Sequence, residues 1–432
     1  MLIRFSVGNY QSFNEIVSLS MVAANITAKN KDLDTNNVFD ISQNIKLLKS
    51  AAIYGANASG KSNLIQAFGF MRWFILNSSR ESTSADPIKI EPFRLSTQTE
   101  DEASFFEVIF FLNGKRYRYG FEADIHKIHS EWLYHANKKE TNLFFREDGQ
   151  IKMSKVFRKE GKGLQDLTRD NALFLSVVEQ WNGPMAQSIL NWFRQVGIIS
   201  GLDDRHYRGF TMSQIIKGGK LSDDIIDFVK KMDFGITDLK VEKDEISEEN
   251  ISSNIPQGLK KAFLDKVNYI HTVTTSHKKY DDDLKPISME VFDLDANESE
   301  GTKKTFSLAG PILDTLRNGK TLIIDELDAR LHPLITCAII NIFNSNSTNP
   351  KNAQLIFATH DTNLLSNKRF RRDQIWFTEK DRYGATDLYS LVEYKIRNDA
   401  SFESDYISGK YGAIPYLGNN QTLVGDADGP KT

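Results

Sequence analysis

A glycine-bounded loop carries the residues whose chemistry is most clearly defined by type and spacing. The loop and the position after it consist of Gly55, Ala56, Asn57, Ala58, Ser59, Gly60, Lys61, Ser62 and Asn63. An apolar run, residues 50–54, precedes the loop, and residues 63–68 have the spacing of a helix. A strand, a glycine-rich turn and a helix in this order let backbone N–H groups and the helix N-terminus bind a phosphate. We therefore predict a nucleoside triphosphate site, with Lys61 on the β- and γ-phosphates and Ser62 as a Mg²⁺ ligand.

Two later apolar strands end in side chains that suit the same site. Residues 321–326 end in Asp325 and Glu326, and residues 354–360 end in His360. An Asp at the end of a buried strand beside a phosphate loop can support Mg²⁺, and the next carboxylate can orient and deprotonate the attacking water. Either strand alone is a weak signal, because many strands end in a polar residue. Together with the phosphate loop they predict a hydrolytic site, with His360 close to the γ-phosphate.

A second helix start also has anion-binding character. Ser299 and Gly301 stand where a helix over residues 303–316 is expected to begin, and a Ser and a Gly at such a position leave N–H groups for an anion. Since the chain already has a phosphate site elsewhere, this second site needs a phosphate held by another subunit. We therefore expect a homodimer or higher homo-oligomer in which each chain's helix start completes the other chain's nucleotide site.

Composition narrows the class of protein. The chain has 432 residues, of which 40% are hydrophobic, and a formal net charge of −3. This predicts a large apolar core and gives no overall positive charge that would indicate nucleic-acid binding. The single cysteine, Cys337, excludes an internal disulfide and lies in an apolar run where a buried structural thiol is expected. Since no signal segment and no apolar run of about 18 residues is found, we expect a cytoplasmic protein without a membrane partner.

The order of the elements predicts an α/β fold. We expect a P-loop NTPase with a mixed sheet, an antiparallel β subdomain and an inserted helical subdomain. The expected units are an N-terminal lobe with the phosphate loop and the β subdomain, a mainly helical insertion, a C-terminal lobe with the other motifs, and a flexible tail, at residues 1–160, 161–260, 261–418 and 419–432. Asn113-Gly114 between the alternating runs 105–112 and 115–121 predicts a β-hairpin.

A basic cluster follows the third of these strands. It consists of Lys368, Arg369, Arg371 and Arg372, with Phe370 and Trp376 close by. Such a cluster can contact a phosphate backbone, or it can be a solvated loop. Without a wider basic excess the solvated loop is favoured, and nucleic acid is left open as a partner.

The motifs as a set resemble those of the ABC-type ATPases of the SMC/Rad50/RecF/OLD group. They follow the order Walker A, signature helix, Walker B with a catalytic Glu, D-loop and His switch. Within that group the chain is most similar to the compact ATP-binding proteins of bacterial abortive-infection and anti-phage systems. The local features behind this narrower resemblance are residues 9–13, 55–63, 298–302, 325–333 and 406–415. The resemblance covers both ends of the chain well and residues 160–260 poorly.

The resemblance implies an ABC-type head that binds ATP with Mg²⁺ and hydrolyses it slowly. The implied roles are phosphate binding and catalysis for Lys61, metal binding for Ser62 and Asp325, water activation for Glu326, γ-phosphate sensing for His360, a place at the dimer interface for Asp328, and contact with the partner subunit's ATP for Ser299 and Gly301. The Ser-Glu-Gly-Thr signature departs from the Leu-Ser-Gly-Gly-Gln run of transporters, which argues against a transporter.

The motifs and the resemblance fit three functions. The leading hypothesis is an ATP-driven switch whose dimer controls an effector in an anti-phage response. Since too little sequence follows His360 for a TOPRIM-type nuclease domain, a separate nuclease or toxin is the expected effector. The alternatives are a DNA-binding clamp of the repair type, in which ATP gates DNA binding, and a scaffold that holds ATP with little turnover and sequesters an effector. A GTPase is disfavoured, because no N-K-x-D motif is found.

Overall fold

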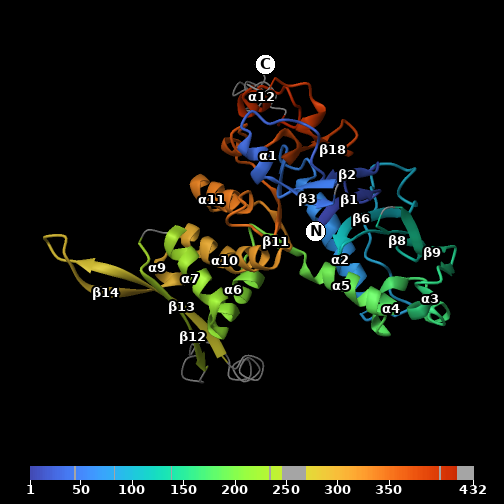
Figure 1. The fold of residues 1–432 in the computed structure, drawn as a ribbon, viewed down its shortest axis with the longest axis horizontal. Coiled ribbons are helices and arrows are strands. Elements are labelled where there is room, and N and C mark those ends of the chain that lie inside the picture. The colour runs from blue at the N-terminus through green and yellow to red at the C-terminus, as the bar shows by residue number, and fades with distance from the viewer. Residues whose placement is uncertain are drawn as a thin grey trace, which may run out of the picture.

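The computed structural model describes residues 1–42, 45–81, 83–137, 139–232, 235–245, 269–397 and 400–415. The predicted tail at 419–432 and residues 246–260 of the predicted helical insertion lie outside this part of the chain. Two larger sheets, a three-stranded sheet and a two-stranded sheet form the framework (Figure 1).

A six-stranded sheet holds the strands that carry the predicted motifs. Its order is β11 (Gly197–Ser200), β15 (Thr321–Asp325), β16 (Gln354–Ala358), β5 (Ser50–Tyr54), β17 (Ile375–Lys380) and β18 (Thr386–Ser390). The first five strands are parallel and β18 is antiparallel to β17. Strands β5 and β16 are buried along their whole length, which explains why they read as continuous apolar runs rather than as alternating ones.

The second large sheet is antiparallel and has seven strands. Its order is β10 (Gln150–Met153), β9 (Glu140–Glu147), β8 (Ile128–Ala136), β7 (Lys115–Ala123), β6 (Ser104–Leu112), β1 (Leu2–Gly8) and β2 (Val17–Ser20). The predicted hairpin is the β6–β7 pair, and its two turn residues Asn113 and Gly114 both have positive φ angles, 49° and 77°. This is the backbone shape for which Asn-Gly is favoured in two-residue hairpin turns.

Two hydrophobic cores lie against the six-stranded sheet, one on each face. One core joins alternate residues such as Ala51 and Ile53 to α2 (Lys61–Asn77) and to the antiparallel sheet. The other joins Ala52 and Tyr54 to α10 (Glu300–Asn318), α11 (Pro333–Phe343) and α12 (Phe402–Ile407). The mixed sheet, the antiparallel β subdomain and the P-loop architecture confirm the predicted fold class.

The helices between the two halves of the site pack in two groups. Helices α4 (Phe174–Gln180) and α5 (Pro184–Gln195) contact α2, whereas α6 (Arg205–Lys217) and α7 (Lys220–Met232) contact α10. Residues 161–260 therefore contain helices, as expected, but also β11 and β12 (Asp238–Glu245). The domain boundaries themselves stay a prediction.

The remaining elements are short, apart from an arm. The arm consists of β12 together with β13 (Tyr269–Tyr280) and β14 (Pro286–Asp293). The short elements are α1 (Asp32–Asn36), β3 (Val38–Ser42), β4 (Ile45–Leu48), α3 (Arg158–Gly161), α9 (Leu294–Asn297) and 3₁₀ turns at Gln165–Leu167, Thr362–Leu364, Arg372–Gln374 and Leu391–Glu393. Cys337 on α11 is half-buried rather than fully buried as expected. Among the described residues, no helix has the length and apolar character to cross a membrane.

Candidate nucleotide-binding site

The glycine-bounded loop joins β5, a central strand of the six-stranded sheet, to the start of α2. Gly60 has a φ of 111°, and a Cβ added there would lie 2.5 Å from Thr386 Oγ1 on β18. Only glycine fits this backbone shape and this close approach. The loop opens at the carboxyl ends of the parallel strands, where ligands bind in open α/β sheets.

Lys61 is the first residue of α2 and is almost completely buried. Its Nζ donates to the backbone carbonyls of Gly55 at 2.9 Å and Ala56 at 3.0 Å, so the loop curls around the ammonium group. Burial lowers the pKa of Lys61, while the nearby carboxylates of Asp325 and Glu326 act in the opposite direction. The positive charge therefore lies among the loop backbone and the acidic end of β15.

The two carboxylates end β15 and begin the following turn. The Oδ1 atom of Asp325 is buried, and the described residues offer it no hydrogen-bond partner. A buried carboxylate oxygen without a donor suits a bound cation or its water shell. The next residue, Glu326, has a φ of 53°, a rare backbone shape for a side chain of this kind.

Mg²⁺ at a phosphate site needs only one or two protein ligands, because phosphates and water complete its shell. Ser62, at the second position of α2, and Asp325 supply oxygens of the required type. Among the described residues, no group of three or more His, Cys, Asp and Glu side chains is arranged to hold a metal on its own. The residues present therefore fit a metal held jointly with a nucleotide.

His360 follows β16 and stands at the rim of the site, where its side chain is exposed. Partial desolvation, together with the positive charge of Lys61, lowers the pKa of its imidazole. The ring is therefore neutral at pH 7 and has one donor and one acceptor nitrogen. The backbone N–H of His360 lies 3.4 Å from Asp328 Oδ2, which connects the predicted D-loop to the strand end.

One cleft of about 400 Å³ gathers most of these groups. It is lined by Asn57, Ala58, Ser59, Gly60, Lys61, Ser62, Asn63, Glu326, His360 and Lys380. The structure thus brings together the loop, a carboxylate of β15 and the His after β16, which are far apart in the sequence. A larger groove of about 710 Å³ beside α7 and α10 is lined by none of the predicted site residues.

Ser299 and Gly301 do not line this cleft. Ser299 is exposed and caps α10, accepting a hydrogen bond from the backbone N–H of Thr302 at 3.1 Å. Gly301 lies in the first turn, where an added Cβ would approach the carbonyl oxygen of Arg330 to 3.3 Å. The start of α10 is therefore exposed at Ser299, and neither Ser299 nor Gly301 lines the subunit's own cleft.

Four residues near the loop were missed by the sequence analysis: Ser12, Thr378, Lys380 and Thr386. Ser59 Oγ lies 2.6 Å from Thr378 Oγ1 on β17, and Thr386 Oγ1 donates to the carbonyl of Ser59 at 3.0 Å. Asn63 Nδ2 donates to Ser12 Oγ at 2.7 Å. Lys380, at the end of β17, adds a second amine to the cleft. Their only sequence signal is polar character in or beside a strand, which does not say which strands are neighbours.

The basic cluster after β16 is only partly at the surface. Arg371 is buried and forms ion pairs with Asp34 and, at 2.8 Å, with Asp373. Phe370 and Trp376 are also buried. The solvated-loop interpretation is thus wrong for Arg371, whose charge is neutralised inside the protein, whereas Lys368 is exposed and fits that interpretation.

Comparison with known proteins gives one family and several distant structures. No curated protein has a sequence that matches this chain. Among solved structures, the chain is similar to an SMC head bound to the C-winged helix domain of ScpA, with 14% identity and a TM-score of 0.45 over 90% of this chain and 97% of that one. The SMC head domain from Thermotoga maritima has 13% identity and a TM-score of 0.40 over 90% and 98%. The recombination mediator protein RecF with ATPγS has 13% identity and a TM-score of 0.34 over the same shares.

At such low identities and scores, nothing about activity or partners follows from these structures. The family match is of a different kind, because it extends from β5 to the residues after the His switch. A family model described as "AAA domain, putative AbiEii toxin, Type IV TA system" matches residues 50–366. The chain belongs to this family of ABC-type ATPases.

Proposed function

We propose that this protein is an ATPase that closes a homodimer around ATP and Mg²⁺ and uses that closure to switch a separate effector in anti-phage defence. The observation that supports the proposal most strongly is the arrangement of the two anion-binding regions. Lys61, Glu326 and His360 share one cleft, whereas Ser299 lies exposed outside it. An exposed helix start that does not line its own subunit's cleft is suited to contact the nucleotide of a second copy.

In this proposal the chain's residues divide the work of hydrolysis. The loop backbone from Gly55 to Gly60 and Lys61 would hold the phosphates, and Ser62 and Asp325 would hold the metal, which would supply positive charge against the charge that develops. Glu326 orients the attacking water and accepts its proton. Neutral His360 donates a hydrogen bond toward the γ-phosphate, and Asp328 lies where the partner subunit would meet the strand end.

The composite site is tested by mixing two inactive variants. Lys61→Ala removes the phosphate-binding amine, and Ser299→Arg places a bulky charge at the start of α10, so each homodimer should lose ATP hydrolysis. Co-expressed subunits form heterodimers with one intact site and one doubly altered site. If subunits assemble at random, about a quarter of the wild-type site activity should return.

The matched control is Ser401→Arg, which removes the N-cap of α12 in the same way. The Ser401→Arg homodimer should hydrolyse ATP by itself, without mixing with another variant, because no predicted site residue lies at the start of α12. If the mixture of Lys61→Ala and Ser299→Arg stays inactive while both subunits are folded and co-purify, the shared-site model is wrong.

The effector part of the proposal rests on the family description and not on the cleft. A nuclease or toxin encoded beside this chain is the expected partner, and a cytoplasmic place of action fits the use of ATP and the single cysteine. Co-purification from the native host, followed by assay of the partner with and without ATP, tests this part separately.

A further inference from the structure

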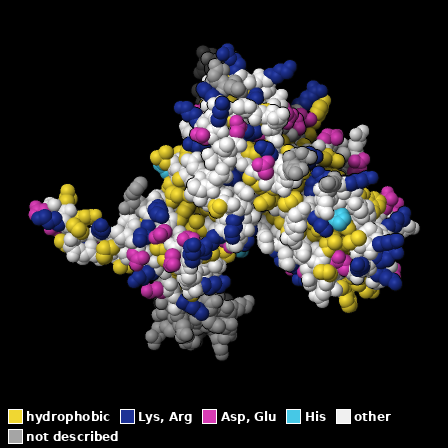
Figure 2. Space-filling view, in the orientation of Figure 1, with side chains coloured by type: hydrophobic (Ala, Val, Ile, Leu, Met, Phe, Trp, Pro, Cys, Tyr) yellow, Lys and Arg dark blue, Asp and Glu magenta, His cyan; other side chains and the backbone are white. Residues whose placement is uncertain are grey.

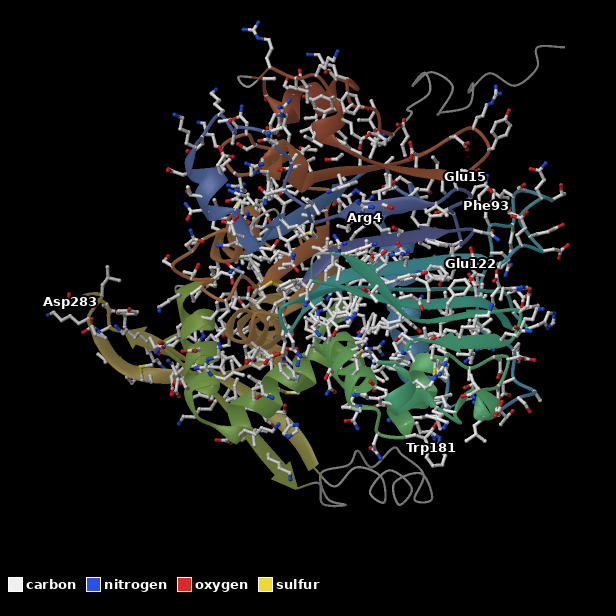
Figure 3. All side chains as sticks on the ribbon, turned by 45° about the vertical axis from the view of Figure 1, so that its right-hand side comes forward. Arg4, Glu15, Phe93, Glu122, Trp181 and Asp283 are labelled. Carbon is white, nitrogen blue, oxygen red and sulfur yellow. The ribbon has the colours of Figure 1, made fainter. Side chains whose placement is uncertain are left out.

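In the arm made by β12, β13 and β14, the hairpin of β13 and β14 extends away from the body of the molecule (Figure 1). Asp283, in the turn between the two strands, marks its far end in Figure 3. Strand β14 is the outer strand of the three-stranded sheet, and no other described strand pairs with its free edge. Edge strands offer unpaired backbone N–H and C=O groups, and proteins usually shorten them, cover them or place charges on them.

The outward face of β14 is apolar. Met289 and Val291 share one face, and Ile287 continues the alternation at the point where the register with β13 shifts by one residue; the three side chains are 49%, 62% and 61% exposed. Figure 2 shows hydrophobic side chains along this arm. A long, exposed and apolar edge is a template for strand addition.

We propose that β14 pairs antiparallel with β14 of a second copy of this chain, in the register centred on Met289. This register places Met289 opposite Met289 and Ile287 opposite Val291, so apolar side chains meet apolar ones on one face. It also places Lys285 opposite Asp293 at both ends of the ladder. The edge is therefore complementary to itself in both apolar character and charge, as a two-fold interface requires.

The neighbouring two-fold registers lack this complementarity. Centring the pair on Glu290 would bring two carboxylates directly opposite each other and would place Ile287 against Asp293. Centring it on Ser288 would place Lys285 against Val291. Like charges, or a charge facing an aliphatic side chain, disfavour a cross-strand pair. The sequence of β14 thus selects one register.

This interface goes beyond the composite ATP site and does not depend on nucleotide. One structural connection to that site lies at the base of the arm. There Glu298 accepts a hydrogen bond from His277 Nε2 on β13 at 2.7 Å, directly before the exposed Ser299. Homotypic pairing of the arms would therefore join two copies through a surface next to, but separate from, the start of α10.

Cysteine pairs test the register in the absence of ATP. The background is Cys337→Ser, which removes the single native thiol. Met289→Cys should form a disulfide-linked dimer on mild oxidation, because opposed Cβ atoms in a ladder lie about 4.5–5.5 Å apart. Ile287→Cys alone should not, since the two copies of residue 287 would be about 13 Å apart. A mixture of Ile287→Cys with Val291→Cys should again give linked dimers.

Leu284→Cys is the matched control, because Leu284 is 80% exposed in the turn of the same arm but has no partner in this register. Equal linking at positions 284, 287 and 289 would mean unspecific collision and would overturn the proposal. Linking at none of them would also overturn it and would assign the edge to a strand of a different protein.

Val291→Lys provides an independent test without cysteine. A charge on the edge should convert the nucleotide-free dimer into a monomer, as measured by light scattering, while ATP binding is retained because Val291 does not line the cleft. If the mass is unchanged, or if the wild-type protein is itself monomeric, the edge does not pair with itself. Neither result bears on the composite site, which the mixing experiment tests separately.

Discussion

Lys304 is a buried cation that connects the helix starting at Ser299 to the acidic end of β15. Its side chain is almost completely buried, and its Nζ donates to the carbonyl of Gly201 and to the hydroxyl of Tyr207. Gly201 in turn donates its N–H to the carbonyl of Asp325 at 2.5 Å. Burial lowers the pKa of Lys304 to about 8.

This pKa predicts a pH-dependent stability. Between about pH 8 and the unfolded value of 10.5, the unfolded chain binds a proton at Lys304 that the folded chain does not, so stability rises with pH. From pH 7.5 to 9.5 the gain in unfolding free energy is about 2 kcal/mol. Lys304→Met should remove this gain, as measured by urea denaturation at both pH values. Lys303→Met, on the same helix turn, controls for loss of a surface lysine.

A variant that keeps the full pH dependence of the wild-type protein would show that the pKa of Lys304 in the folded state is close to its value in the unfolded chain. That outcome would also remove the reason for linking the start of α10 to Asp325 through this side chain. Measurements should stop below pH 10, because tyrosines begin to ionise there and stabilise the unfolded chain.

At the scale of elements, the loop and α2 depend on what β18 places beside them. Thr386 on β18 touches the loop where Gly60 has no side chain, and its hydroxyl donates to the carbonyl of Ser59. Gly69 lies in the middle of the same helix, and a Cβ added there would meet nothing within 4 Å. A methyl group added at Gly60, the N-cap of α2, would therefore collide with Thr386, whereas one added at Gly69 inside α2 would meet no neighbouring atom.

Gly60→Ala and Gly69→Ala should change stability in opposite directions. Gly60→Ala forces a side chain into a φ of 111° and against Thr386, and should destabilise by about 1–3 kcal/mol and weaken ATP binding. Gly69→Ala should stabilise by about 0.5–1 kcal/mol, because alanine is the better helix former and has room. Thermal unfolding and an ATP-binding titration measure both effects. A neutral Gly60→Ala would mean that the loop can move away from β18.

The elements that could be predicted are those whose signals are local. The phosphate loop, the Asn113-Gly114 hairpin and the apolar strands at 321–325 and 354–358 are set by residues within a few positions of one another. The strand order was not predictable, because it depends on contacts between distant segments; for this reason Thr386 and Lys380 were missed. The arm was missed as an arm because the alternation of Ile287, Met289 and Val291 predicts a half-buried strand, whereas β14 is exposed on nearly every residue.

At the scale of the whole molecule, the six-stranded sheet separates two cores, and the cleft opens at the strand ends between them. Two surfaces remain for other copies of the chain. The exposed start of α10 is suited to a partner's nucleotide, and the edge of β14 is suited to a partner's β14. The two contacts can be separated by experiment, because one requires ATP and the other does not.

The double variant Glu326→Gln with Val291→Lys isolates the ATP-dependent contact. Val291→Lys removes pairing of the arms, so the protein should be a monomer without nucleotide. Glu326→Gln keeps the shape of the cleft but removes the base, and should slow hydrolysis about 10²–10⁴-fold without loss of ATP binding. ATP and Mg²⁺ should then double the mass and hold it there, as measured by light scattering, whereas ADP should not.

The control variant carries Glu147→Gln in place of Glu326→Gln, at an exposed residue of the antiparallel sheet. In this control the ATP-dependent dimer should decay as ATP is consumed. A double variant that binds ATP but stays monomeric would contradict closure around the nucleotide, because Ser299 could then not lie against the cleft of a second copy.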